Sequence, residues 1–105
     1  MEKQYSNNKK DIGILISKGY GAGWYSWNRQ FTACLYDPEI IQLVLTDRHK
    51  LIPELALKKY GEDFFPDGYK DLVVEWIAVG TRFIVREHDG NEWIEKEDQM
   101  GWQVA

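Results

Sequence analysis

The stretch with the clearest capacity for chemistry runs from Gly19 to Asn28 and combines three glycines with four aromatic residues and no charge. Glycines let a backbone turn sharply and approach a partner closely, because they carry no Cβ atom. Aromatic rings beside them supply flat, stiff contact area. This combination is typical of a recognition loop, so binding is the function that these residues indicate first.

The specific nucleotide-binding motifs are absent from this loop. A P-loop requires Gly-Lys-Ser/Thr after its glycines, and the dinucleotide fingerprint requires a third glycine where Trp24 stands. A looser interpretation is that glycine amides form an anion-binding concavity while Trp24, Tyr25 or Trp27 stacks on a base or ribose. The alternative is that the glycines only make a tight turn and the tryptophans fill the core. The loop residues predicted to contact a ligand are Tyr20, Gly21, Gly23, Trp24, Trp27 and Asn28.

Two arginines, Arg82 and Arg86, are predicted to share one face of a strand. Four residues at the rise of a strand separate them by roughly 13 Å, which would let them hold opposite ends of an elongated anionic ligand. A structural use is the alternative, because Arg86 could lie over Trp93 or pair with Glu95.

No set of residues has the pattern of a catalytic or metal centre. The two histidines, His49 and His88, lack further ligands at metal-binding spacing, and Cys34 has no histidine near it in sequence. Glu75 lies in an apolar run, where burial could make it an acid or base, but an ion pair or exposure would also explain it. We therefore expect no metal, no cofactor and no catalysis, and nucleotide hydrolysis through Glu75 is the least favoured function.

Length and composition indicate a single α+β domain at residues 11–105 behind a flexible N-terminal arm at residues 1–10. Five tryptophans and six tyrosines in 105 residues are more than one small core can bury, so some rings should lie at the surface or in a pocket. The net charge of −4 argues against nonspecific nucleic-acid binding. The acidic residues concentrate at positions 87–98, either as a surface that steers a partner or simply as a solvated face.

A lone cysteine and the lack of a long apolar run predict a cytoplasmic protein.

The elements that must position these residues follow from periodicity. Alternating isoleucines predict a strand near residues 12–17, and Asp37-Pro38 predicts the start of a helix that ends near residues 46–47. Pro53 and Gly61 should bracket a second helix. Residues 72–79 predict a strand that is central in its sheet, because both of its faces are apolar. Residues 29–36 fit a strand or a helix start equally well.

A hairpin is predicted around Asp89-Gly90, with strands at residues 82–88 and 91–96. A two-residue turn would place Val85 opposite Ile94 and Arg86 opposite Trp93. A last short strand is expected at residues 102–104. The predicted fold is α+β, with a curved antiparallel sheet of about four to five strands and two helices packed on one face.

Several segments together resemble a family of short uncharacterised proteins encoded by bacteriophages. The similarity covers most of the chain from about Lys18 and is carried by Gly-Tyr-Gly-Ala-Gly-Trp at residues 19–24, Asp-Leu-Val-Val-Glu-Trp at 71–76, Gly-Thr-Arg-Phe at 80–83 and Trp-Gln-Val-Ala at 102–105. The resemblance implies a phage accessory protein acting inside a bacterial host, and it implies no specific activity. Accessory phage proteins of this size often act against host defences.

Two functions follow from combining the residues with this setting. The first is an anti-defence protein that binds and sequesters a small nucleotide-like immune signal without catalysis, as a homo-oligomer that encloses the ligand. The second is an inhibitor that blocks a host defence protein through the acidic hairpin at residues 87–98.

Overall fold

A computed structural model describes residues 3–6 and 9–97 of the chain. Two helices and four strands follow one another in the order strand, helix, helix, strand, strand, strand, with short 3-10 turns between them. The elements are β1 (Asp11–Ser17), α1 (Pro38–Leu45), α2 (Ile52–Tyr60), β2 (Leu72–Ala78), β3 (Phe83–His88) and β4 (Asn91–Lys96). The α+β class predicted from the sequence is confirmed, and the strand expected at residues 102–104 lies outside the described residues.

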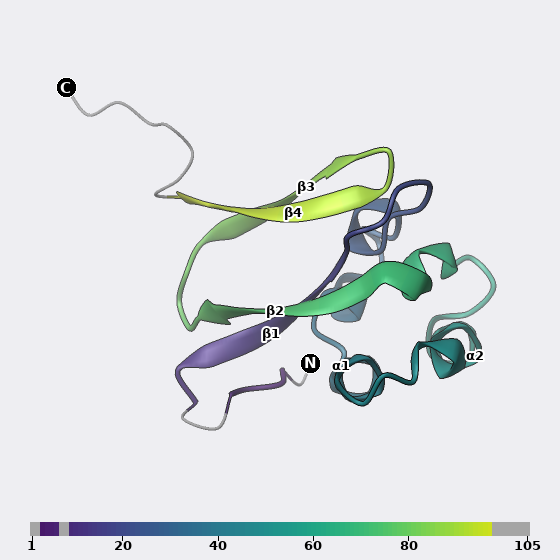
Figure 1. Cartoon of the computed structure of the whole chain (residues 1–105), viewed down its shortest axis with the longest axis horizontal. Helices are drawn as coiled ribbons and strands as arrows, with labels where there is room; N and C mark the ends of the chain where they lie inside the picture. The colour runs from purple at the N-terminus through teal and green to yellow at the C-terminus, as the bar shows by residue number, and fades with distance from the viewer. Residues whose placement is uncertain (1–2, 7–8, 98–105) are drawn as a thin grey trace.

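The four strands form two antiparallel two-stranded sheets, β1–β2 and β3–β4, so the prediction of one curved sheet of four to five strands is wrong in this respect. The helices lie on one side of the β1–β2 sheet, and the β3–β4 hairpin lies on the other (Figure 1). The connection between β2 and β3 contains Gly80 and Thr81, and at this turn the chain passes from the first sheet to the second. Gly80 has a positive φ of 87°, a conformation that glycine adopts without strain.

Strand β1 is the most buried strand, because it is covered on both faces. Leu15 packs into the core formed with the helices, whereas Ile12, Ile14 and Ile16 pack toward the hairpin with Val85. This arrangement divides the apolar interior into two clusters that meet across β1. Alternating isoleucines therefore mark the hairpin-facing side of the strand, and Leu15 marks its helix-facing side.

The prediction that the strand at residues 72–79 is central is wrong for the described part of the chain, where β2 pairs only with β1. Its apolar residues still point both ways: Leu72 packs with the helices and Ile77 packs with the hairpin. Two apolar faces thus report layers above and below a strand, not neighbours on both of its edges.

Both helices begin and end where the sequence predicts. The buried carboxylate of Asp37 accepts hydrogen bonds from the amides of Glu39 (3.0 Å) and Ile40 (3.2 Å), which caps α1. Gly61 ends α2 with a φ of 90°. The same Asp37 carboxylate accepts a hydrogen bond from the Tyr60 hydroxyl (2.5 Å) and forms an ion pair with Lys59 (2.9 Å), so it joins the start of α1 to the end of α2.

The hairpin register predicted from the sequence is confirmed: Val85 lies opposite Ile94 and Arg86 lies opposite Trp93. Asp89 and Gly90 both have positive φ, as a two-residue hairpin turn requires. The segment at residues 29–36, for which the sequence left two alternatives, forms a 3-10 turn over Thr32–Leu35.

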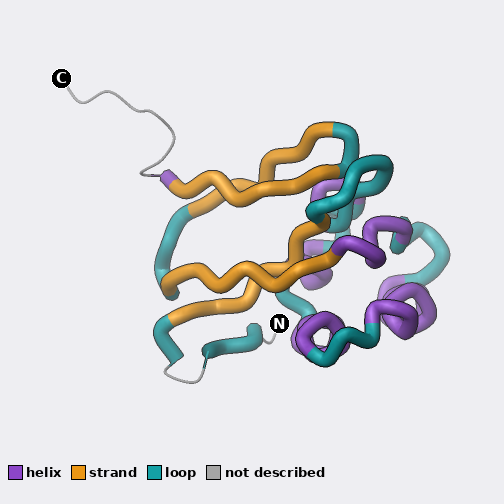
Figure 2. The backbone as a smooth tube through the Cα atoms, viewed as in Figure 1, coloured by secondary structure: helices purple, strands orange, loops and turns teal. Residues whose placement is uncertain are grey.

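Part of the segment predicted as an N-terminal arm lies against the outer edge of β1. The amide of Gly13 donates a hydrogen bond to the carbonyl of Gln4 (2.8 Å), and Tyr5 forms a bridge with Ile12. Figure 2 shows this short segment beside the β1 strand. The flexibility of residues 1–10 as a whole stays a prediction.

Candidate functional site

The Gly19–Asn28 loop is held by a carboxylate from the hairpin. Glu92, the second residue of β4, is fully buried and accepts hydrogen bonds from the amides of Ser17 (2.7 Å), Trp24 (3.0 Å) and Ser26 (2.7 Å). The hydroxyl of Ser26 donates a fourth hydrogen bond (2.6 Å). A buried carboxylate with several backbone donors is well stabilised without a cationic partner.

Backbone amides therefore do converge here, but they belong to Ser17, Trp24 and Ser26 and not to the glycines that the sequence analysis named, and the group that they bind is the chain's own Glu92 carboxylate. Sequence reasoning counted Glu92 with the acidic hairpin surface and missed this role. One feature of the sequence did indicate that Glu92 is buried. In the predicted register Glu92 shares the inward face of the hairpin with Ile94 and Val85, where an acidic side chain must find hydrogen-bond donors.

Trp24 and Asn28, two of the predicted ligand contacts, are buried and serve the structure. The Trp24 indole packs edge-on against Phe64, with ring centroids 5.0 Å apart, and its Nε1–H donates to the carbonyl of Cys34 (2.9 Å). The Asn28 amide donates to the carbonyls of Trp24 (2.7 Å) and Phe65 (2.9 Å) and accepts from the Phe65 amide (2.7 Å). Neither side chain can stack on a ligand or read its edge in this conformation, because burial and these bonds occupy both.

The remaining loop residues stay near the surface. Tyr20 is 73% exposed and Trp27 is 40% exposed. The Trp27 indole stacks at a tilt on Phe65, with centroids 5.3 Å apart, and donates to the Glu87 carboxylate (3.1 Å). Gly21 has a φ of +99°, and a Cβ on Gly23 would lie 2.4 Å from the Ser26 hydroxyl oxygen, so both glycines are required by the turn itself.

The two predicted arginines do not meet the loop residues around a common cavity. Arg86 forms an ion pair with Glu95 (2.6 Å) on the outward face of the hairpin, which is the structural alternative that the sequence left open. The Arg82 side chain is 81% exposed and lies 3.6 Å from the Glu97 carboxylate. Of the predicted ligand contacts, Arg82 alone lines the groove described next.

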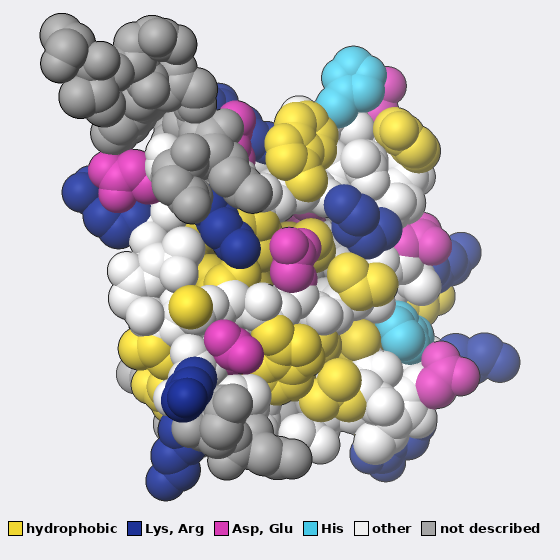
Figure 3. Space-filling model, turned by 60° about the vertical axis from the view of Figure 1, so that its left-hand side comes forward, with side chains coloured by type: hydrophobic (Ala, Val, Ile, Leu, Met, Phe, Trp, Pro, Cys, Tyr) yellow, Lys and Arg dark blue, Asp and Glu magenta, His cyan; other side chains and the backbone are white. Residues whose placement is uncertain are grey.

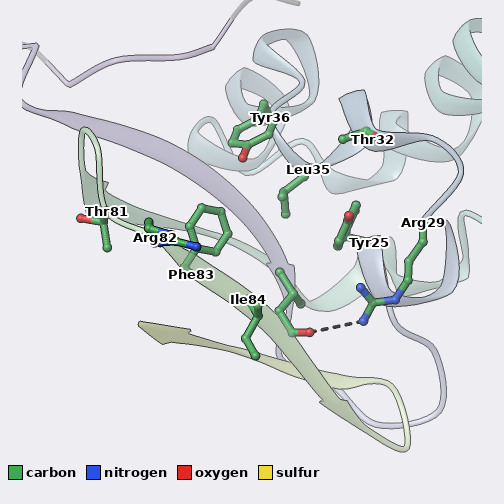
Figure 4. A pocket seen from close by; sticks show the side chains of 10 residues that line it. Tyr25, Arg29, Thr32, Leu35, Tyr36, Thr81, Arg82, Phe83 and Ile84 are labelled. Carbon is green, nitrogen blue, oxygen red and sulfur yellow. Dashed lines mark hydrogen bonds between the residues drawn. The ribbon is translucent and has the colours of Figure 1, made fainter. Parts of the chain in front are cut away.

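A groove of about 410 Å³ runs between β3 and the segment that follows the glycine loop. One wall carries Tyr25, Arg29 and Tyr36, and the other carries Arg82 and Phe83. Figure 4 shows these side chains around the groove, with Arg29 and Arg82 toward its opposite ends. The sequence pointed to Tyr25 only as one of three residues that could stack on a ligand. It gave no signal for Arg29, because the groove forms between two segments, residues 25–36 and 81–85, that are far apart in the chain.

Two features give the groove its chemistry. The Arg29 guanidinium lies 5.4 Å from the centre of the Tyr25 ring and donates to the carbonyl of Val85 (3.3 Å), so one cation is fixed against an aromatic wall. Burial raises the pKa of the Tyr36 phenol, and the nearby Tyr25 raises it further. Tyr36 is therefore neutral at physiological pH and can donate a hydrogen bond.

The two residues considered for catalysis, Cys34 and Glu75, differ in their surroundings. Burial raises the pKa of Cys34, with Glu92 and Asp37 adding to the effect, so Cys34 is a neutral thiol inside the core. Glu75 is half-buried opposite Ile14 and forms no ion pair with another described residue. Within residues 3–6 and 9–97, no three His, Cys, Asp or Glu side chains are grouped as a metal site would require.

The histidines have separate environments. The ring of His49, which the sequence places at an exposed position, is partly buried with Nε2 2.9 Å from the carbonyl of Leu72. His88 is exposed near the hairpin turn, 3.5 Å from the Asp89 carboxylate.

No helix in the described part of the chain combines the length and apolar character needed to span a bilayer.

Comparison with known proteins adds no relative to this picture. No protein-family model matches the chain, and neither the curated proteins nor the solved structures contain a significant match. The resemblance to short phage proteins therefore stays a prediction, and function must be argued from the geometry of this chain alone.

Proposed function

We propose that this protein binds a small anionic molecule with a flat ring, of the nucleotide class, in the groove between β3 and residues 25–36, and that it does so without catalysis. The observation that carries the proposal is the combination of two arginines and two tyrosines around one hollow. Arg29 and Arg82 supply positive charge, while Tyr25 and Tyr36 supply aromatic surface and hydroxyl groups.

The spacing of the cations suits an elongated ligand. Arg29 bonds to the carbonyl of Val85, three residues along β3 from Arg82, which corresponds to roughly 10 Å of strand. A ring between the two could lie against Tyr25 or Phe83 while phosphate or carboxylate groups reach the guanidinium groups. Glu97 competes for Arg82, but an exposed ion pair of this kind contributes little free energy and can be exchanged for a ligand.

The size of the groove supports a small ligand. Its volume of about 410 Å³ falls within the range of small-molecule sites, and its lining mixes apolar rings with a few polar groups. A groove on a single subunit leaves one side of a ligand open to water. We therefore retain the proposal that a second copy of the chain closes over the ligand.

In a phage setting, such binding would sequester a nucleotide immune signal of the host. This biological role rests on the resemblance at residues 19–24, 71–76, 80–83 and 102–105, whereas the ligand class rests on the groove. The two parts of the proposal can therefore fail separately.

Calorimetric titration with cyclic dinucleotides and cyclic ADP-ribose isomers tests the ligand class. Binding that weakens about tenfold in Arg29→Gln and in Arg82→Gln would support the groove, since each charged contact is worth on the order of 1–2 kcal/mol. Arg48→Gln is the matched control, because Arg48 is exposed beside Thr46 and does not line the groove. The absence of binding heat with every nucleotide would refute the ligand class.

The second candidate function is inhibition of a host protein through the hairpin, and one observation favours it. Trp93 and Ile84 are exposed on the outward face of the hairpin, beside the Arg86–Glu95 ion pair. The acidic charge itself is less available than the sequence indicates, because Glu92 is buried. A stoichiometric partner that is retained by the native chain and lost from Trp93→Ser, but not from Arg29→Gln, would support this function over ligand binding.

A further inference from the structure

One edge of β2 has hydrogen-bonding groups that no other described residue uses. The bonds from Val79 N to Lys10 O (2.8 Å) and from Lys18 N to Asp71 O (3.0 Å) show which residues of β2 bond to β1. In an antiparallel pair, alternate residues turn their amide and carbonyl groups away from the partner strand. The outward-facing residues of β2 are Leu72, Val74, Trp76 and Ala78.

The free groups lie in the middle of this edge. At its ends, the carbonyl of Leu72 bonds to His49, and the carbonyl of Ala78 accepts a hydrogen bond from the turn that follows β2. Val74 and Trp76 have no backbone partner among the described residues, which leaves two donors and two acceptors side by side. Such a row of free groups is a template for one more strand.

The side chains of the two residues with free backbone groups offer apolar surface on one face of β2. Val74 and Trp76 lie on the side of α1, because a Cβ atom added to Gly13 would meet them at 3.1 and 3.2 Å together with Ile41. Trp76 is 38% exposed, so a neighbouring strand would remove apolar surface from water there. Figure 3 shows hydrophobic side chains reaching the surface at several places on one face of the molecule, between acidic and basic groups.

Glu75 lies between these two residues and points to the opposite face of β2. That face is the side of the hairpin, where Ile77 is buried. Glu75 is half-buried and forms no ion pair or hydrogen bond with another described residue. Its own backbone groups face β1, and at such a position of the outer edge the Cβ atoms of opposing residues are only about 4.5–5.5 Å apart. A cationic side chain opposite Glu75 would therefore be attracted, and an acidic one would be repelled.

The same charge argues against a second copy of the chain as the occupant of the edge. Pairing Val74 with Trp76 across a twofold axis uses only groups that are free, but it places the two Glu75 side chains directly opposite each other. Like charges in that arrangement destabilise a strand pair. The edge is therefore better suited to a different chain that brings a basic residue to this position.

We propose that the free edge of β2 binds an extended segment of a partner protein by strand addition, and that this segment has a basic residue between two apolar residues. The backbone groups of the two apolar residues bond to Val74 and Trp76, and their side chains lie on the side of α1, where Trp76 is exposed. The basic residue lies opposite Glu75 on the side of the hairpin. In this mode of recognition the backbone bonds supply affinity and the alternating side chains supply specificity. The inference is independent of the groove and of its ligand.

NMR titration of the full-length chain with the capped peptide Thr-Val-Lys-Val-Thr tests this surface. The amide resonances of Val74 and Trp76 should shift most, while the Ile77 amide, which bonds to β1, should keep its slow exchange and shows that the fold is intact. The peptide Thr-Val-Glu-Val-Thr should bind about fivefold more weakly, the ratio expected for one cross-strand charge pair. The peptide Thr-Pro-Lys-Pro-Thr keeps the charge but lacks both backbone donors, and it should not bind.

Glu75→Gln tests the role of the charge separately from that of the backbone. The variant keeps every backbone group of the edge, so it should bind the Lys and Glu peptides with equal affinity. Glu62→Gln is the matched control, because Glu62 is exposed in the loop after α2, and this variant should retain the preference of about fivefold.

Titrations in which the Val74 and Trp76 resonances do not shift, or in which the native chain binds the Lys and Glu peptides equally, would overturn the proposal. Slow exchange of these two amides before any peptide is added would overturn it too. Protection that rises with protein concentration would identify a second copy as the occupant, and protection at every concentration would show that the chain itself covers the edge.

Discussion

The Gly19–Asn28 loop and the groove along β3 contain the same kinds of groups, aromatic rings beside groups that suit an anion, yet the chain uses them differently. In the loop, the amides of Trp24 and Ser26 face Glu92 and the Trp24 ring is buried. In the groove, Arg29 and the neighbouring tyrosine rings line a hollow. Residue types alone do not separate a binding site from a structural corner. The distinguishing property is whether the chain itself satisfies the polar groups.

The largest effect should come from breaking the contact that holds the loop. Glu92→Gln replaces a carboxylate that accepts four hydrogen bonds by an amide whose NH₂ group faces donors. We expect the free energy of unfolding, measured by urea denaturation, to fall by about 3–5 kcal/mol, because several buried donors lose their acceptor and each unsatisfied buried group costs on the order of 1–3 kcal/mol. Glu95→Gln is the control on the same strand and should cost under about 1 kcal/mol, because the Arg86–Glu95 pair is more exposed. Equal losses in the two variants would contradict the assigned role of Glu92.

A smaller loss of stability is expected from Asn28→Ala. The substitution leaves the Phe65 amide and the carbonyls of Trp24 and Phe65 without the partner that they have in the native chain. About 2–3 kcal/mol should be lost in the same denaturation experiment, since unsatisfied buried polar groups carry that cost. Asn28→Ala could instead unfold at the same midpoint urea concentration as the native chain and lose ligand affinity. Asn28 would then be a ligand contact, as the sequence predicted, and the proposed difference between loop and groove would be wrong.

The groove variants should behave in the opposite way. Arg29→Gln and Arg82→Gln should change the free energy of unfolding by less than about 1 kcal/mol, because Arg82 is exposed and Arg29 makes one long hydrogen bond. Both should nevertheless reduce nucleotide affinity in calorimetry, as proposed above. Variants that destabilise the protein as strongly as Glu92→Gln would show that the arginines support the fold and would remove the basis for a site there.

The smallest effect concerns alkaline pH. Burial raises the pKa of Tyr60, and the hydrogen bond to the Asp37 carboxylate raises it further. In the unfolded chain Tyr60 loses its proton near pH 10, while the native state retains it, so this contribution is present below about pH 10 and is lost as the pH rises above it. Thermal unfolding of Tyr60→Phe between pH 8 and 11 should show a shallower decline than the native chain. Parallel declines would mean that Tyr60 keeps its ordinary pKa.

Much of the fold follows from local signals in the sequence. The Asp37-Pro38 start of α1, Gly61 after α2 and the Asp89-Gly90 turn each fix a backbone conformation through one or two residues, and each is confirmed. The division into two sheets was not predictable in this way. It depends on the direction in which the chain turns between β2 and β3. The apolar pattern of β2 does not reveal that direction, because the pattern would be the same whether β3 paired with the edge of β2 or packed against its face.

The candidate site was less predictable than the fold. The sequence identified Arg82 and gave Tyr25 as an alternative stacker, but Arg29 and Tyr36 reach the groove only through packing of distant segments. The sequence analysis assigned a binding role to the loop from its glycines and aromatic rings. Whether the loop amides are free to bind a ligand depends on Glu92, which lies 64 residues or more beyond the loop in the chain. Pairing over such distances is set by tertiary structure, which a single sequence does not reveal.

The most direct test of the proposed difference between loop and groove is an NMR titration of the full-length chain with the nucleotide that gives the largest calorimetric heat. We predict that the backbone amide shifts change most at Arg29, Arg82 and Phe83 and little at Gly21 and Trp27. Shift changes confined to Tyr20, Gly21 and Trp27, with the β3 amides unmoved, would contradict the groove and return the binding role to the loop.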